Sequence, residues 1–219
     1  MASVRFRGVA GRAPLPTVTL TGEHVRLEPL GPEHVDGLVA AASVDRSSYD
    51  WTTVPDGREA MARYVATLGE AHAAGEVLPF AQVRTDTGEP IGCTRFLEPR
   101  WFSGREFPDE VEVGGTWLGA AAQRTPVNTE SKLLMFTHAF DQFGVWRLTV
   151  ATDANNVRSR AAIERVGATF EGVLRNHRLQ QGGHLAPGAP PAPRDTAVHS
   201  ITRNEWPAVR AGLLAKLGR

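Results

Sequence analysis

The sequence contains a single cysteine, Cys93, among its 219 residues. One cysteine cannot form an internal disulfide and cannot build a cysteine-based zinc site, so we expect no bound metal. The lack of disulfides is typical of proteins in a reducing compartment, and we predict a cytoplasmic location.

Long hydrophobic runs are absent as well. The first 20 residues carry Arg5, Arg7 and Arg12 but no continuous apolar segment, which argues against a secretory signal. No later stretch approaches the roughly 20 apolar residues that a membrane-spanning helix needs. We therefore expect no membrane association.

Neither sign of charge is in excess, because Lys plus Arg and Asp plus Glu both total 24. Without a global field, neither nucleic acid nor an anionic membrane is favoured as a partner, and specificity must come from a local site. The sequence also lacks G-x-G-x-x-G and G-K-[ST] loops, which disfavours an unrelated α/β nucleotide-binding fold.

At 219 residues and 42% hydrophobic content, the chain is long enough for one large core. We expect a flexible N-terminal arm over residues 1–18 and a single domain over residues 19–219. Within this domain, residues 181–194 are rich in proline, glycine and alanine, and we expect them to form a mobile loop that does not pair as a strand.

Hydrophobic periodicity predicts an antiparallel meander followed by alternating strands and helices. In the first half, strands are expected at 25–30, 78–84, 90–97 and 110–118, and helices at 35–42 and 58–75. In the second half, helices are expected at 128–143, 156–167 and 206–217, and strands at 146–150, 170–179 and 195–201. This order predicts an α/β (α+β) fold, with a mixed, mostly antiparallel sheet of about seven strands flanked by helices.

Two segments can carry chemistry. Val111 to Lys132 combines a strand, a short loop and a helix start, whose unpaired N–H groups and partial positive charge can hold a diphosphate. Asn155 to Gly172 combines a polar helix entry with a buried face and a glycine stop. Neither segment alone is specific, because every helix has such an end.

Taken together and in this order, the segments resemble the GNAT superfamily, most closely its RimJ/RimL-like branch of protein N-terminal acetyltransferases. The resemblance covers Thr19 to Leu217. It depends on five pieces: L-T-G-E-H-V-R-L-E-P-L, V-E-V-G-G-T-W-L, N-T-E-S-K-L-L, N-x-x-S-x-x-A-I-x-R-x-G-A-x-x-E-G, and D-T-A-V-H-S-I followed by E-W-P. It implies a single GNAT-type domain whose sheet splays between strands four and five to admit the pantetheine arm of an acyl-CoA.

The resemblance implies transfer of an acyl group, usually acetyl from acetyl-CoA, directly to a primary amine such as a protein or peptide N-terminus. Two alternatives remain open. One is the same reaction on a small-molecule amine, including an amine-bearing antibiotic. The other is a degenerate domain that binds CoA or serves as an interaction module. A homodimer is an expectation at the level of the family.

Attack on the thioester requires a neutral amine, and because an alkyl ammonium has a pKa of about 10, a base is needed. Glu112 is the first candidate, from its family counterpart on the fourth strand, although an exposed strand glutamate is the alternative. His177 and His199 are further candidates, because histidine titrates near neutral pH. For both histidines a structural or exposed role is the simpler interpretation.

The resemblance also assigns contacts with the coenzyme. The backbone N–H near Leu118, next to Trp117, is the expected oxyanion donor. Ser159 matches a serine that can donate to the thioester sulfur, whereas many family members use a tyrosine at the position of Ile163. For Ser159, a helix-start residue that satisfies backbone groups is the alternative. Further expected contacts are Asn156 and Arg158 at one helix start, and Arg124, Thr125, Val127, Asn128 and Thr129 at the other. For Arg158, a solvated surface arginine is the simpler interpretation.

The phosphate loop departs from the family pattern. Arg124 and Pro126 stand where two glycines are usual, and proline has no N–H to donate to a phosphate. The guanidinium of Arg124 can compensate for this loss.

Overall fold

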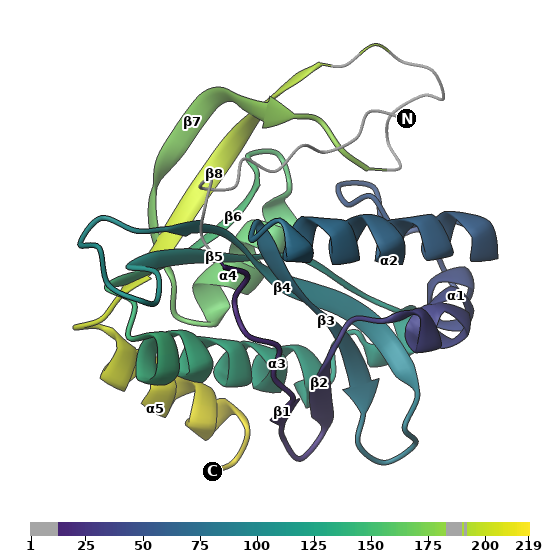
Figure 1. Ribbon diagram of the computed structural model, residues 1–219, viewed down its shortest axis with the longest axis horizontal. Helices are drawn as coiled ribbons and strands as arrows, with labels where there is room; N and C mark the ends of the chain where they lie inside the picture. The colour runs from purple at the N-terminus through teal and green to yellow at the C-terminus, as the bar shows by residue number, and fades with distance from the viewer. Residues whose placement is uncertain (1–12, 183–189, 191) are drawn as a thin grey trace.

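The computed structural model describes residues 13–182, 190 and 192–219. In these ranges the chain forms one eight-stranded sheet in the order β1-β2-β3-β4-β5-β6-β8-β7 (Figure 1). All neighbouring strands are antiparallel except β5 and β6, which are parallel. The strands are β1 (Leu20–Thr21), β2 (Val25–Pro29), β3 (Val77–Arg84), β4 (Pro90–Arg100), β5 (Glu110–Leu118), β6 (Arg147–Asp153), β7 (Thr169–Leu179) and β8 (Pro193–Thr202).

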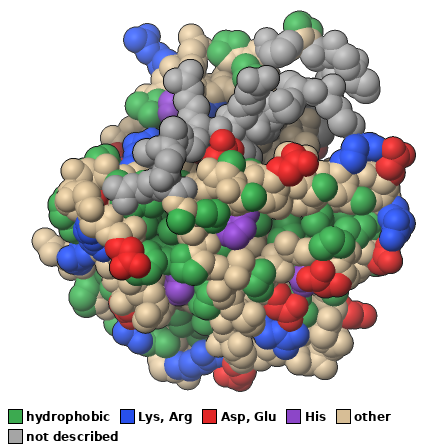
Figure 2. All heavy atoms as spheres, in the orientation of Figure 1, with side chains coloured by type: hydrophobic (Ala, Val, Ile, Leu, Met, Phe, Trp, Pro, Cys, Tyr) green, Lys and Arg blue, Asp and Glu red, His purple; other side chains and the backbone are tan. Residues whose placement is uncertain are grey.

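Helices cover both faces of the sheet (Figure 1). On one face, α1 (Val35–Ser43) and α2 (Arg58–Ala73) pack on β3 and β4. On the other face lie α3 (Pro126–Thr137), α4 (Val157–Arg165) and α5 (Trp206–Lys216), which share one hydrophobic core with the sheet. None of the helices in the described ranges has the length and apolar character that crossing a bilayer requires. Acidic and basic side chains are interspersed over the face shown in Figure 2, in line with their equal numbers in the sequence.

The expected mixed, mostly antiparallel sheet is confirmed, with one strand more than expected because Leu20–Thr21 pairs with β2. The expected helix 128–143 begins at Pro126 and continues after Thr137 as a π-helical segment, His138–Phe143. This wider turn places both Phe140 and Phe143 in the core, where Phe140 stacks on Trp206 at 5.2 Å between ring centroids.

Two expected flexible segments lie partly outside the described residues. Of the arm 1–18, residues 13–18 are described, and the buried Leu15 joins the core while its carbonyl oxygen lies 2.8 Å from His72 Nε2. Of the loop 181–194, residues 183–189 and 191 are outside the described part. Strand pairing extends further than expected here, because Pro193 lies opposite Leu179 and Arg194 opposite Arg178 at the edge of β8.

The expected splay between strands four and five is confirmed. These two strands are β5 and β6 in the structure, because the short β1 was not among the expected strands. These strands are paired only where Glu110, Val111 and Glu112 face Arg147, Leu148 and Thr149. Beyond Glu112, β5 remains paired with β4 but bulges at Gly114 and Gly115. Gly115 has a φ of 56°, a left-handed conformation that glycine adopts readily. A bulge increases the local bend and twist, so it directs the C-terminal half of β5 away from β6.

Candidate active site

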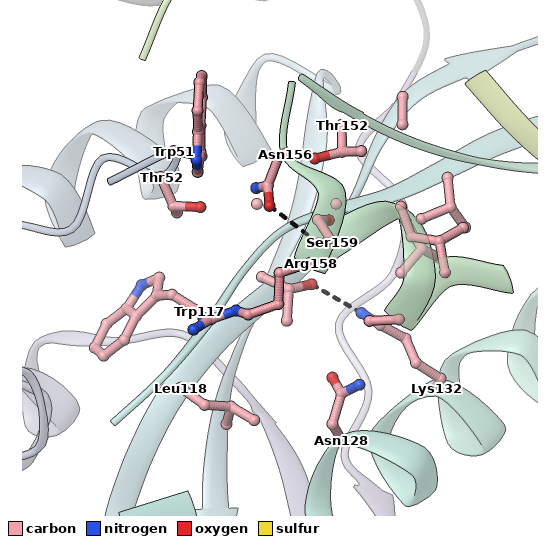
Figure 3. Close-up of a pocket in the computed structure, with 18 of the residues that line it drawn as sticks. Trp51, Thr52, Trp117, Leu118, Asn128, Lys132, Thr152, Asn156, Arg158 and Ser159 are labelled. Atoms are coloured by element: carbon pink, nitrogen blue, oxygen red, sulfur yellow. Dashed lines mark hydrogen bonds between the residues drawn. The ribbon is translucent and has the colours of Figure 1, made fainter. Parts of the chain in front are cut away.

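The splay opens into a cavity of about 1620 Å³ between β5 and β6 (Figure 3). Its walls include the starts of α3 and α4, the connection between α1 and α2, and residues of β7 and β8. A cavity that holds one drug-sized ligand measures roughly 300–1,000 Å³, so this one has room for two substrates.

The backbone of β5 faces the cavity at Leu118. The N–H of Gly119 donates to the carbonyl oxygen of Ile91 on β4 at 2.8 Å. Because N–H groups alternate in direction along an antiparallel strand, the N–H of Leu118 points to the other side, towards the splay. Its carbonyl oxygen accepts hydrogen bonds from Tyr49 Oη at 3.3 Å and from Gln123 Nε2 at 2.9 Å, so the Leu118 carbonyl has partners from two other elements.

The start of α3 keeps the form of a capped helix despite its proline. Thr125 is the N-cap, and its Oγ1 accepts a hydrogen bond from the N–H of Val127 at 3.4 Å. Pro126 occupies the first helical position, where a backbone N–H has no partner within the helix, so proline is well tolerated. The N–H of Asn128 at the third position also has no partner within the helix and remains a donor at this end of the cavity.

Arg124 adopts a left-handed backbone conformation, with a φ of 59°. An L-residue pays roughly 1–2 kcal/mol for this conformation, and glycine does not. The turn therefore keeps the backbone path expected for glycine while it places a guanidinium beside the cavity. We predict that Arg124→Gly raises the free energy of unfolding by about 0.5–1 kcal/mol, as measured by chemical denaturation, and weakens CoA binding, as measured by calorimetry.

The matched control is Arg124→Asn, because asparagine tolerates the left-handed region and also removes the charge. Both variants should lose the same fraction of CoA affinity. The glycine variant should have the higher free energy of unfolding of the two. Wild-type CoA affinity in both variants would show that the Arg124 guanidinium makes no contact with a phosphate.

The start of α4 lies across the cavity from β5. Asn156 is its N-cap, and Oδ1 accepts from the N–H of Ser159 at 3.0 Å (Figure 3). The Asn156 amide nitrogen is therefore available to donate to a ligand. Arg158 donates from Nη2 to the carbonyl oxygen of Ser48 at 3.4 Å, and Ser48 Oγ accepts from Gln123 at 2.8 Å. Ser48 thus connects the two helix starts.

Glu112 lies where β5 and β6 part, and its side chain is 7% exposed. Both of its carboxylate oxygens accept from Arg178, at 3.0 and 2.6 Å, and Arg178 also donates to Glu98 at 2.7 Å. Burial raises the pKa of Glu112, and the contacts with Arg178 act in the opposite direction. Glu112 can take a proton only through the lone pairs that Arg178 leaves unused, so its role as a base remains a prediction.

The cavity brings together most of the residues expected from the sequence: Glu112, Trp117, Leu118, Arg124, Thr125, Asn128, Thr129, Asn156, Arg158 and Ser159. Val127 and His177 are not among the described residues that line it. The Val127 side chain is buried in the core under α3. His177 lies on the exposed strand β7 and lines an adjoining cavity of about 490 Å³, which shares Glu112 and Arg178 with the first.

The third base candidate, His199, is fully buried in β8. Its Nε2 lies 3.6 Å from Glu164 Oε1, and its ring packs on Phe170 at 5.2 Å between centroids. Burial lowers its pKa, and it is not among the described residues that line either cavity. These surroundings favour the structural interpretation.

Some residues of the site were missed from the sequence, among them Tyr49, Arg178 and Lys132, which all line the cavity. Lys132 was detectable, because it lies four positions after Asn128 and therefore on the same face of the helix. Tyr49 and Arg178 gave no local signal, since each contacts β5 from a distant part of the sequence.

The comparisons with known proteins agree with this geometry. The family model of the acetyltransferase (GNAT) domain matches residues 24–169. A GCN5-related N-acetyltransferase structure from Brucella melitensis is 29% identical, covers 94% of this chain and 90% of its own, and superposes with a TM-score of 0.75. An acetyltransferase structure from T. thermophilus is 30% identical, with 93% and 98% coverage and a TM-score of 0.73.

RimJ from Mycobacterium smegmatis, solved in complex with CoA-disulfide, is 20% identical and covers 93% of this chain and 94% of its own, with a TM-score of 0.70. At this identity the likeness shows a shared fold. A search of curated proteins finds no match. The family model and the two more similar structures show that the chain belongs to the GNAT acetyltransferase family and is an N-acetyltransferase.

Proposed function

We propose that the protein transfers the acetyl group of acetyl-CoA to the primary amine of a peptide or protein N-terminus by direct attack. The observation that carries this proposal is the continuous cavity along the splay, which joins two helix starts at one end to the Glu112–Arg178 pair at the other. A ternary complex of both substrates needs such a shared space, because direct attack requires the amine and the thioester to meet.

The helix-start end suits the coenzyme. The N–H of Asn128, the amide of Asn156 and the guanidinium groups of Arg124 and Arg158 are donors that suit phosphate and pantetheine oxygens. The N–H of Leu118 would donate to the thioester oxygen as it gains negative charge, and Ser159 would hydrogen-bond to the sulfur. These groups lie in the order that an extended pantetheine arm needs, with the phosphates at the helix starts and the thioester along β5.

The charges at the Glu112–Arg178 end of the cavity favour an acceptor with a single amine over a polyamine. The carboxylates at this end, Glu98 and Glu112, both accept from Arg178. Arg95, Arg100 and Arg194 line the same region. A site for a polycationic antibiotic would need carboxylates without cationic partners, whereas a peptide N-terminus brings one amine and a polar backbone.

The test is release of free thiol from acetyl-CoA with a panel of N-terminal peptides and, in separate reactions, small amines and aminoglycosides. We expect peptides to be acetylated at the α-amine, with the product located by mass spectrometry. If only small amines were turned over, the acceptor would be a small molecule and not a peptide. CoA binding without any turnover would support an interaction module instead.

Ser159→Ala should lower kcat about tenfold, the cost of one lost hydrogen bond of roughly 1–1.5 kcal/mol. The dissociation constant of CoA, measured by calorimetry, should change little, because Asn156 still caps α4 through the backbone of residue 159. Ser159→Thr keeps the hydroxyl and serves as the control. An unchanged kcat in the alanine variant would remove Ser159 from the mechanism.

A further inference from the structure

Lys132 is a buried cation in the wall of the cavity. Lys132 is 6% exposed. Its Nζ donates a hydrogen bond to Thr116 Oγ1 at 2.8 Å and lies 3.5 Å from Thr94 Oγ1. Within the described part of the chain, no carboxylate lies within ion-pair distance of Nζ. A buried ammonium without a counter-ion is costly, so its presence in a substrate cavity calls for a function.

The choice of lysine at this position is unusual for this chain. Of the 24 basic residues, only Lys132 and Lys216 are lysines, and the others are arginines. Arginine stays protonated in proteins, whereas a buried lysine can lose its proton. The cavity therefore contains the type of basic side chain that can exchange a proton.

Burial lowers the pKa of Lys132 to about 7. Other charged side chains also line this cavity: Asp50, Glu98, Glu112, Arg95, Arg100, Arg124, Arg158, Arg165, Arg178 and Arg194. Both Glu98 and Glu112 are paired with Arg178. At neutral pH the Lys132 amine is consequently present in both protonation states, the condition under which a group transfers protons well.

Lys132 is directed at the part of β5 where the thioester would lie. Its partner Thr116 lies on β5, two residues before Leu118. Figure 3 shows Lys132 extending from α3, with its amine hydrogen-bonded to β5. Ile163, which also lines the cavity on α4, has no proton to donate, and the hydroxyl of Ser159 is a far weaker acid than an ammonium.

We propose that Lys132 is the catalytic acid that protonates the departing coenzyme A thiolate, an inference that rests on the proposed acetyl transfer. The amine nitrogen bonds to the carbonyl carbon, and the carbon–sulfur bond breaks with its electron pair on sulfur. Sulfur takes a proton from the Lys132 ammonium, while the new amide nitrogen loses one proton to a base or to water. Lys132 then regains a proton from solvent, so each turnover yields one amide and one free thiol.

The first test measures the ionisation of Lys132 without activity. In protein labelled with ¹³C-lysine, the two lysine side chains give separate NMR signals, and Lys132→Met assigns them. We expect Lys132 to titrate near pH 7. A Lys132 midpoint near the ordinary lysine value of about 10 would overturn the proposal.

The second test compares Lys132→Met, Lys132→Arg and the matched control Lys216→Met. Both Lys132 variants should lose about 100-fold or more in kcat, because methionine has no proton and arginine does not release one. The fall in kcat at alkaline pH should disappear in Lys132→Met, while CoA affinity and melting temperature are retained. Lys216→Met should behave as wild type.

Several outcomes overturn the inference. Wild-type kcat in Lys132→Arg would show that a positive charge alone suffices. If kcat of Lys132→Met still fell at alkaline pH, that fall would be caused by another group. An acetyl group found on Lys132 after turnover would also contradict it, because an amide nitrogen does not supply this proton. Failure of the proposed function is distinguishable, since the wild-type protein would then release no thiol with any amine while the NMR titration still reports on Lys132.

Discussion

Replacing Glu112 by alanine should lower the free energy of unfolding by about 3 kcal/mol, which is near the lower end of the cost of breaking a buried ion pair. The side chains of Glu112 and Arg178 are 7% and 25% exposed, and the two hydrogen bonds between them are parallel. Without Glu112, Glu98 is the one acidic partner that Arg178 keeps among the described residues, and Arg178 remains largely buried. Chemical denaturation followed by circular dichroism measures the loss.

The control for this prediction is Glu98→Ala, which removes the more exposed partner of the same arginine and should cost no more than about 1 kcal/mol. Equal losses in both variants would contradict the assigned importance of the Glu112 contact. Glu112→Gln separates stability from catalysis. If Glu112 assists proton removal, this variant needs a higher pH to reach half of its maximal rate, and an unaltered pH profile would exclude Glu112 as the base.

Glu130→Ala should destabilise the protein by a similar amount, about 3 kcal/mol. The Glu130 carboxylate is fully buried on α3 and accepts from the backbone N–H groups of Glu23, His24 and Val25 at 2.9, 2.5 and 2.9 Å. Its loss leaves these donors near the β1–β2 turn without their partner, and each buried, unsatisfied donor costs roughly 1–3 kcal/mol. Partial access of water to the turn keeps the total near the stated value.

The pH dependence of this effect has a defined sign. Burial alone would raise the pKa of Glu130, but the N–H donors and Arg219 outweigh it and hold the pKa below its usual value. A carboxylate with a lowered pKa stabilises the fold above its unfolded pKa of about 4.3, and this stabilisation is lost as pH falls through the folded value. The difference between wild type and Glu130→Ala should be constant near neutral pH and shrink below about pH 4.

Arg219→Ala is the control, because Arg219 contacts the same carboxylate at 2.5 Å but is 34% exposed. It should cost less than about 1 kcal/mol. If Arg219→Ala were as damaging as Glu130→Ala, the ion pair and not the backbone contacts would hold the turn.

Much of the coenzyme end of the site follows from short-range features of the sequence. A threonine or asparagine before a helix, and a glycine after one, act on neighbouring backbone groups, so Thr125, Asn156 and Gly167 mark the helix ends without knowledge of the fold. Alternating apolar residues likewise locate the strands, because each strand buries one or both faces regardless of its partners. This is why the start of α4 and the strand at Leu118 were placed correctly along the chain, whereas the start of α3 was expected at Asn128 and lies at Pro126.

The functional character of the individual side chains was decided by the tertiary structure. Glu112 meets Arg178, 66 positions away, only because β7 folds back over the end of β5, and the same path places His177 in a neighbouring cavity. Lys132 has an ordinary lysine sequence context, and its low pKa arises from burial between α3 and β5. The sequence alone determined which backbone segments form the helices and strands, since those signals are local. Burial, pairing and proton affinity are sums over neighbours from distant segments, so they exist only once the sheet is assembled.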